Sequence, residues 1–196
     1  QYEQLRRRAQ TEPWRSMQEG VRSCTSLVYT PDASIYGQYS SITAVMRQAA
    51  LAVILYPQDR QRYVDHIVDQ LAHWDDLNAI RRQRPKADWA SMINGGDAFF
   101  TSILALDIIH DDLTPAQLVT IETRLQTWYE YERDEASGSW YLAKYGAMGL
   151  WALYLNDQDA FEAHARAYDK RLRQHFSDDG VALVGGNYAS ARLAGG

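Results

Sequence analysis

The chain is poor in the features that mark disulfide-rich, membrane-spanning and nucleic-acid-binding proteins. Its 196 residues include a single cysteine, Cys24, which excludes an internal disulfide and a cysteine-ligated metal cluster. The longest apolar run, residues 49–56, is far shorter than the roughly 18 residues that a membrane-spanning helix needs. The net charge of −5 also contrasts with the basic surface that binds phosphates. We therefore expect neither a membrane span nor a nucleic-acid partner.

The composition that remains is typical of a folded globular protein. Hydrophobic residues make up 46% of the chain, charged residues 23%, and there are six tryptophans, which together exclude a disordered chain. The length suffices for one substantial core, so we treat residues 1–196 as a single domain. Cys24 is in phase with Trp14, Met17 and Val21, and we expect it to be a buried structural thiol.

Apolar spacings of three and four residues recur through most of the chain and predict helices. The first long helix is expected to stop at Pro57, because proline cannot continue a helix. Helices are also predicted over about 140–155 and 158–175, and the one strand-like stretch is 181–184. The apolar faces are formed by Tyr39, Ile42, Val45, Met46, Ala49 and Val53; by Tyr63, Ile67, Leu71 and Trp74; by Phe99, Ile103 and Leu106; by Leu118, Ile121, Leu125 and Trp128; and by Phe161, Ala165, Tyr168 and Leu172.

Similar turn sequences recur about every fifty residues, which indicates stacked αα-hairpins. Residues 55–59 and 153–157 both contain Leu-Tyr followed by an aspartate, and residues 111–114 form a similar turn between them. Thr114, with Pro115 and Gln117 after it, has the form of a capping box at the start of a helix. Stacked hairpins form either an open solenoid or a closed α/α toroid, and an irregular helical bundle is the remaining alternative.

Two short motifs carry a family resemblance. Gly138-Ser139-Trp140-Tyr141 stands at the predicted start of a helix; Asp179-Gly180 and then Gly185-Gly186-Asn187-Tyr188 follow about forty residues later. This pair resembles the alginate-lyase and heparinase II/III group of polysaccharide lyases. The chain departs from the family pattern at Ala136-Ser137, where the family has Asn-His, and at Val184, where it has Glu. The resemblance implies an all-α fold of antiparallel helix hairpins forming part of an α/α toroid, incomplete on its C-terminal side.

The resemblance further implies β-elimination on glycans that contain uronic acids. Tyr188 corresponds to the family's catalytic tyrosine, which takes or returns a proton. We place Arg192, one helical turn further on, as a clamp on the sugar carboxylate. The substrate-binding candidates are Ser137, Ser139, Trp140, Tyr141 and Asn187. Each also has a purely structural interpretation: Tyr188 as a packing residue, Arg192 as a solvated side chain, Asn187 as turn chemistry and the serines as helix caps.

Several alternatives stay open at this point. A non-catalytic carbohydrate-binding or helical-repeat interaction protein is favoured by the missing Asn-His pair. A glycoside hydrolase on the same scaffold needs two carboxylates, for which Asp97, Asp178 and Asp179 are the candidates. The basic residues 81–86, placed in a loop, either hold a polyanionic glycan at the rim of a cleft or are simply solvated. We expect no metal and no cofactor, and an acidic polysaccharide or oligosaccharide as the partner. A chain that begins at Gln1 fits a mature periplasmic or secreted protein, or a shortened chain.

Overall fold

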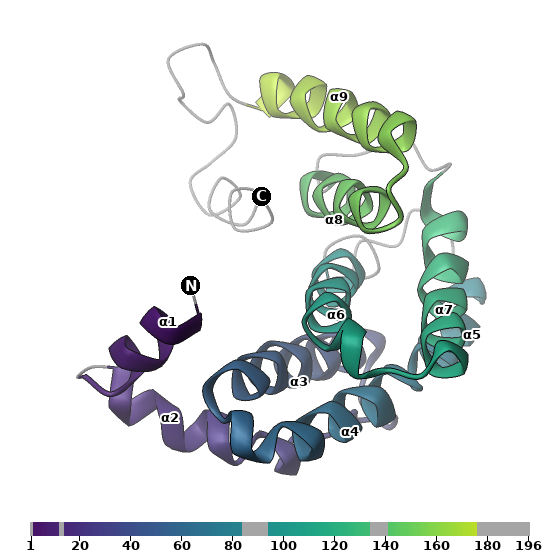
Figure 1. Ribbon diagram of the computed structural model, residues 1–196. Coiled ribbons are helices and arrows are strands. Elements are labelled where there is room, and N and C mark those ends of the chain that lie inside the picture. The colour runs from purple at the N-terminus through teal and green to yellow at the C-terminus, as the bar shows by residue number, and fades with distance from the viewer. Residues whose placement is uncertain (1, 12–13, 84–93, 134–140, 176–196) are drawn as a thin grey trace.

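The structure is a computed structural model that describes residues 2–11, 14–83, 94–133 and 141–175 (Figure 1). The described ranges contain the 3-10 helices η1 (Cys24–Ser26), η2 (Pro57–Asp59) and η4 (His110–Asp112). The all-α prediction is confirmed over these ranges, in which no strand occurs. The α-helices are α1 (Tyr2–Ala9), α2 (Trp14–Arg22), α3 (Ile35–Leu55), α4 (Arg60–Leu71), α5 (Trp74–Arg82), α6 (Gly96–Ile109), α7 (Pro115–Arg133), α8 (Tyr141–Tyr154) and α9 (Gln158–His175).

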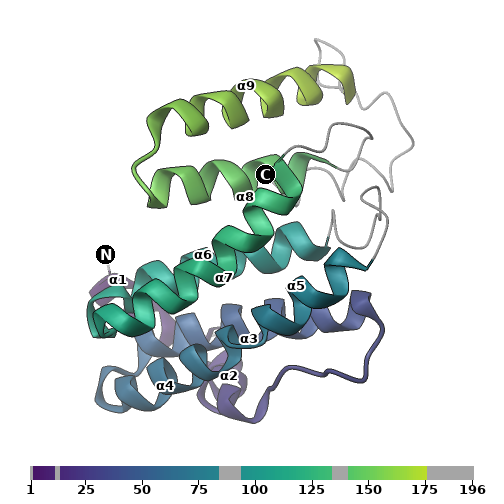
Figure 2. The same cartoon turned by 90° about the vertical axis from the view of Figure 1, so that its right-hand side faces the viewer.

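The helices pack in two rows. In one row α6 contacts α3 on one side and α8 on the other, and Figure 2 shows these helices stacked one above another with α9 beyond α8. In the second row α4 packs against α3, and α7 contacts both α4 and α5. The N-terminal helices α1 and α2 pack on α3. Figure 1 shows the result as an arc that is open on one side, with α1 and α9 towards its two ends.

Short turns join the helices within each hairpin, at the positions that the sequence predicts. Pro57 begins η2 between α3 and α4. Before α7, Thr114 and Gln117 form the capping box reciprocally: the Gln117 amide donates to Thr114 Oγ1 over 3.3 Å, and the Thr114 amide donates to Gln117 Oε1 over 3.0 Å. After α8, Asn156 has a φ of 58°, and the Asp157 amide reaches back to the Ala152 carbonyl over 2.8 Å. This hydrogen bond closes α8 as a Schellman motif.

Contacts between the turns place them at one end of the stack, which we call the turn end. Arg60 at the start of α4 donates to the Asp112 carboxylate over 2.8 Å and to the Ile108 carbonyl over 3.0 Å. The rings of His110 and Tyr154 lie 6.3 Å apart, which brings the second turn to the end of α8. Helices α4 and α7 run away from the turn end, and α6 and α8 run towards it. Therefore α5 and α7 finish, and α6 and α8 begin, at the opposite end. We call this opposite end the connection end.

An aromatic cluster contributed by four helices forms the centre of the core. Phe99 of α6 lies with its ring centroid 4.5 Å from that of Trp128 of α7, and 5.8 Å from those of Trp74 of α5 and Trp151 of α8. All four side chains are buried, and the predicted apolar faces of α3 to α7 surround them, with Leu118 half-buried. The Cys24 thiol is buried as expected, and burial raises its pKa.

The structure corrects the predicted helix over residues 63–74. All four residues of the predicted face are buried, but the helix is interrupted between Leu71 and Trp74. The amides of Ala72 and His73 donate hydrogen bonds to carbonyls three residues back, so the backbone there has the tighter winding of a 3-10 turn. The Tyr29 ring stacks on His73 with centroids 4.4 Å apart, a contact between distant segments that apolar periodicity does not report.

One further expectation about burial is wrong. Ala165 of α9 is exposed, and among residues 158–173 of that helix the buried side chain is His164. Helix α9 lies at the end of the arc, and among the described helices it packs mainly on α8. Trp14, which the sequence places in phase with buried residues, is 53% exposed beside the gap between α1 and α2.

Candidate functional site

Most of the predicted site residues lie outside the described part of the chain. These are Ser137, Ser139, Trp140, Asn187, Tyr188 and Arg192, together with the departures at Ala136 and Val184. The structure describes the backbone of Tyr141, which is the first residue of α8, but not its side chain. The structure therefore places only the last residue of the first motif, at the start of α8 at the connection end.

Three charged side chains are buried together at this connection end, and we call them the buried ion-pair cluster. Glu132 of α7 accepts a hydrogen bond from Arg81 Nε of α5, and its second oxygen lies 3.0 Å from Lys144 Nζ of α8. The exposed fractions of the three side chains are 1% or less. Because each buried ion loses several kcal/mol of hydration, the cluster is stable only while its members stay paired.

Arg81 shows that the predicted basic loop is partly a helix end. Arg81 and Arg82 are the last two residues of α5, and Arg81 points into the protein; residues 84–86 lie outside the described ranges. Burial opposes the charge on Arg81, but the hydrogen bond and the charge of Glu132 outweigh it and raise the pKa of the guanidinium. The guanidinium also lies 4.8 Å from the ring centroid of Tyr131. Arg81 is thus unavailable as a solvated contact for a glycan.

His164 adds a titratable group beside the cluster. It lies 2.9 Å from the Tyr129 hydroxyl of α7, and only 9% of the residue is exposed. Burial and the positive charge of Lys144 hold the pKa of His164 below its ordinary value, against a smaller opposing influence of Asp157. Sequence reasoning missed both His164 and Lys144, because each is a lone polar residue on a helix and carries no motif.

An aromatic pocket of about 420 Å³ lies between α6, α8 and α9. Two glycines of α8, Gly146 and Gly149, lack the side chains that would narrow it, and a Cβ on Gly149 would touch Phe161 and His164 of α9 at 3.8 Å. Aromatic rings offer flat apolar faces on which the C–H groups of a sugar ring can rest. The sequence analysis did not single this pocket out. Its aromatic lining residues are Phe100, Tyr145, Phe161 and Tyr168.

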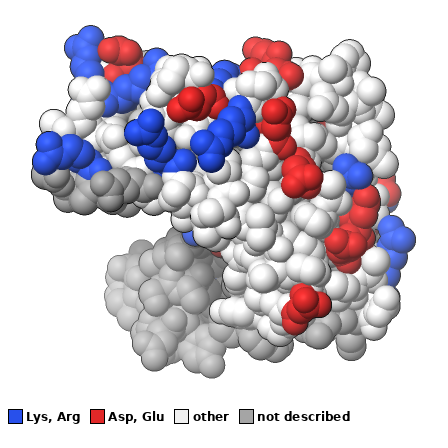
Figure 3. Space-filling model, turned by 90° about the horizontal axis from the view of Figure 1, so that it is seen from below, with Lys and Arg blue, Asp and Glu red and all other residues white. Residues whose placement is uncertain are grey.

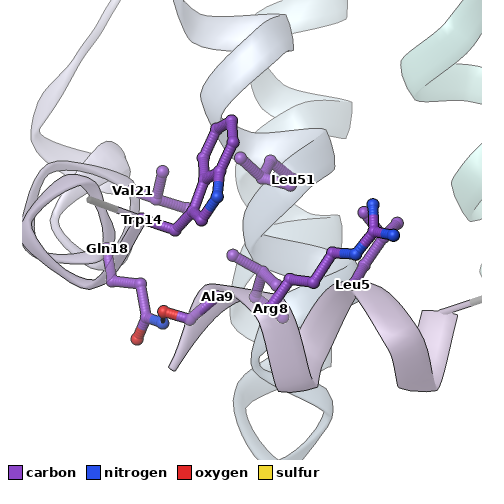
Figure 4. Close-up of a pocket in the computed structure, with 8 residues that line it drawn as sticks. Leu5, Arg8, Ala9, Trp14, Gln18, Val21 and Leu51 are labelled. Carbon is purple, nitrogen blue, oxygen red and sulfur yellow. Dashed lines mark hydrogen bonds between the residues drawn. The ribbon is translucent and has the colours of Figure 1, made fainter. Parts of the chain in front are cut away.

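A second pocket, of about 260 Å³, lies at the other end of the arc between α1, α2 and α3 (Figure 4). Leu5, Trp14 and Leu51 give it an apolar lining, and Arg8 is the charged residue at its edge. Gln18 donates a hydrogen bond to the Ala9 carbonyl and so fastens α2 to the end of α1. Leu5 and Trp14 are 43% and 53% exposed, so this pocket presents apolar surface to solvent.

Charges are unevenly distributed over the face of the molecule that Figure 3 shows. Figure 3 shows Lys and Arg gathered on the side where α1 and α2 lie, and Asp and Glu towards the opposite side. Helix α1 contributes Arg6, Arg7 and Arg8 to the basic side. This surface offers a weak, non-directional attraction for polyanions at moderate ionic strength.

The carboxylates of the described residues give little support to hydrolytic or metal chemistry. Asp97, the one described candidate for a glycosidase carboxylate, is bonded to Arg47 over 2.7 Å; Asp178 and Asp179 lie outside the described ranges. Within the described ranges, no three His, Cys, Asp or Glu side chains come together as metal ligands. The helices described by the structure include none long and apolar enough to cross a membrane.

Comparisons of this chain with protein-family models, with curated proteins and with solved structures found no match.

Proposed function

We propose that this protein is a polysaccharide lyase or close relative that cleaves uronic-acid glycans by β-elimination. The observation that carries the proposal is the sequence motif Gly138-Ser139-Trp140-Tyr141, whose last residue begins α8 within a stack of αα-hairpins. The second motif follows the end of α9. The arc of paired helices supports the further proposal that the chain forms part of an α/α toroid whose open side accommodates the glycan.

The chemistry assigns three tasks to these residues. The sugar carboxylate must be hydrogen-bonded so that charge can develop on the adjacent carbon, and Arg192, Asn187 and the Ser139 hydroxyl are proposed for this in place of the missing Asn-His pair. The first turn of α8 is proposed to favour the same carboxylate, since a helix N-terminus attracts anions. The other two tasks are removal of the proton next to the carboxylate and protonation of the leaving oxygen. Tyr188 is proposed for either of these proton transfers.

The aromatic pocket is consistent with a carbohydrate substrate. Phe100 of α6 and Tyr145 of α8 come from the row of helices that lines the open side of the arc, and Tyr168 of α9 extends this surface. We propose that this surface supports sugar rings away from the reacting bond. Ser137, Trp140 and Tyr141 are assigned to the same glycan, closer to the reacting bond.

The test is an absorbance assay of Tyr188→Phe beside the wild-type protein on alginate, glucuronan, hyaluronan and heparan-type glycans. β-Elimination creates an unsaturated uronate that absorbs in the ultraviolet. Removing only the hydroxyl should abolish turnover while the helical circular dichroism and glycan affinity stay nearly unchanged. Full activity in Tyr188→Phe would remove this residue from the mechanism.

A non-catalytic interaction protein on the same scaffold is the second candidate. The exposed apolar pocket beside Trp14 and the Ala136-Ser137 replacement favour it. Measurable glycan binding without any absorbance change would decide for this alternative. A glycoside hydrolase is the weaker alternative, since Asp97 is already paired with Arg47.

A further inference from the structure

One carboxylate holds the ends of three helices at the connection end. Glu132 is the next-to-last residue of α7, Arg81 is the next-to-last residue of α5, and Lys144 lies in the first turn of α8. The pair between Glu132 and Lys144 therefore joins the end of α7 to the start of α8, on either side of residues 134–140. The pair between Glu132 and Arg81 ties the end of α5 to the same point.

We propose that Lys144 and Glu132 are positioning residues that fix the start of α8, at which the glycan carboxylate is proposed to bind. This inference rests on the proposed function for its catalytic consequence. Its structural part, that the ion pairs set the placement of the first turn of α8, stands on the described residues alone.

Burial makes this pairing more restrictive than the other ion pairs between helices. Arg124 of α7 and Asp75 of α5 are 2.8 Å apart, but their side chains are 22% and 64% exposed. Water and salt can replace such a contact, so it contributes little to geometry or stability. Lys144 and Glu132 are 0% exposed, so neither has water as a substitute partner. Displacing the start of α8 separates buried opposite charges, which is costly.

Helix geometry carries this constraint from Lys144 to Tyr141. Residues three apart lie on the same side of a helix and are separated by one turn. Holding Lys144 against Glu132 therefore sets both the rotation of α8 about its axis and the height of its first turn. Small errors in the placement of groups around a reacting bond can cost about a hundredfold in rate, so a loose α8 start would impair turnover.

The decisive variant is Lys144→Met, which keeps an unbranched side chain of similar length and leaves the Arg81–Glu132 pair in place. Arg124→Met is the matched control, because it also breaks an ion pair of α7, with Asp75 of α5, but an exposed one. Lys144→Arg is the rescue variant, since it restores the positive charge.

Hydrogen exchange is the first measurement. In Lys144→Met we expect faster exchange at the amides of residues 145–148, with α3 and α6 unchanged, while Arg124→Met leaves all of these amides unchanged. Unchanged exchange at 145–148 overturns the proposal. Faster exchange spread evenly over all helices also overturns it, since that result indicates only a general loss of stability.

Kinetics on the glycan that the wild-type protein cleaves is the second measurement. Lys144→Met should lower kcat by about ten- to a hundredfold with KM within about twofold, and Lys144→Arg should recover most of the loss. An unchanged kcat overturns the catalytic part of the proposal. If the wild-type protein cleaves no acidic glycan, the proposed function fails, and hydrogen exchange still decides whether the cluster fixes the start of α8.

Discussion

The two ends of the helical stack are held together in different ways. At the turn end, short turns are closed by local hydrogen bonds, and the linking ion pair between Arg60 and Asp112 is 37% and 21% exposed. At the connection end, Glu132 with Arg81 and Lys144 is almost completely buried. The described contacts at the turn end are thus local and partly exposed, whereas the ion pairs of the buried ion-pair cluster at the connection end are shielded from water.

The largest expected effect is the loss of Glu132. Glu132→Ala leaves the charges of Arg81 and Lys144 buried without this carboxylate, and should lower the free energy of unfolding by about 3–5 kcal/mol. Urea denaturation followed by circular dichroism measures this change. A loss below about 1 kcal/mol would remove the contrast between the two ends, because it would equal that of an exposed pair.

A cap at the turn end should matter less. Thr114→Ala removes the Oγ1 atom that accepts from the Gln117 amide, and should cost about 1 kcal/mol. Thr120→Ala, on an exposed face of the same helix, is the control and should cost less than this. The same denaturation experiment compares the two, and equal losses would mean that the capping box contributes nothing specific.

A smaller effect is expected for the exposed pair. Asp112→Asn should cost about 0.2–1 kcal/mol, and the loss should shrink at high salt. Under the same conditions, the effect of Glu132→Ala should be nearly independent of salt, since buried charges are poorly screened. Salt dependence in both variants would contradict the difference in burial.

The pH dependence of stability sharpens the comparison at the connection end. Burial and Lys144 depress the pKa of His164 in the folded protein, so the unfolded chain binds its proton first as the pH falls. The stability associated with neutral His164 is therefore complete above the unfolded pKa of about 6.5 and decreases as the pH falls from there towards the folded pKa. His164→Gln should flatten the stability profile over this range in denaturation series at stepped pH, and an unchanged slope would exclude His164 as its source.

The contrast between the ends also explains what the sequence reveals. The turn at Asn156 and the cap at Thr114 depend on residues adjacent in the sequence, and both were predicted from those residues. The apolar face of α3 was predicted because helical periodicity is equally local. Arg81 was instead predicted to lie in a loop, either at the rim of a glycan cleft or simply solvated. Its partner Glu132 is distant in the chain, and a run of basic residues looks the same in the sequence whether it is buried or exposed.

The candidate site likewise combines features that depend on adjacent residues with features that depend on contacts between distant helices. The start of α8 was predicted to within a residue, since a glycine-serine segment precedes an apolar helix there. The roles of Lys144 and His164 depend on contacts with α7, which nothing in their own surroundings reveals. The aromatic pocket likewise arises only when α6, α8 and α9 are brought together.

The most direct test of the proposed function is the mass of the products formed from an acidic glycan by the wild-type protein. β-Elimination adds no water, so one fragment of each cleavage is an unsaturated uronate, and the fragment masses sum to the mass of the starting glycan. This is the result that we predict. Fragments whose masses sum to the starting glycan plus one water would show hydrolysis, and would contradict the assignment of a lyase.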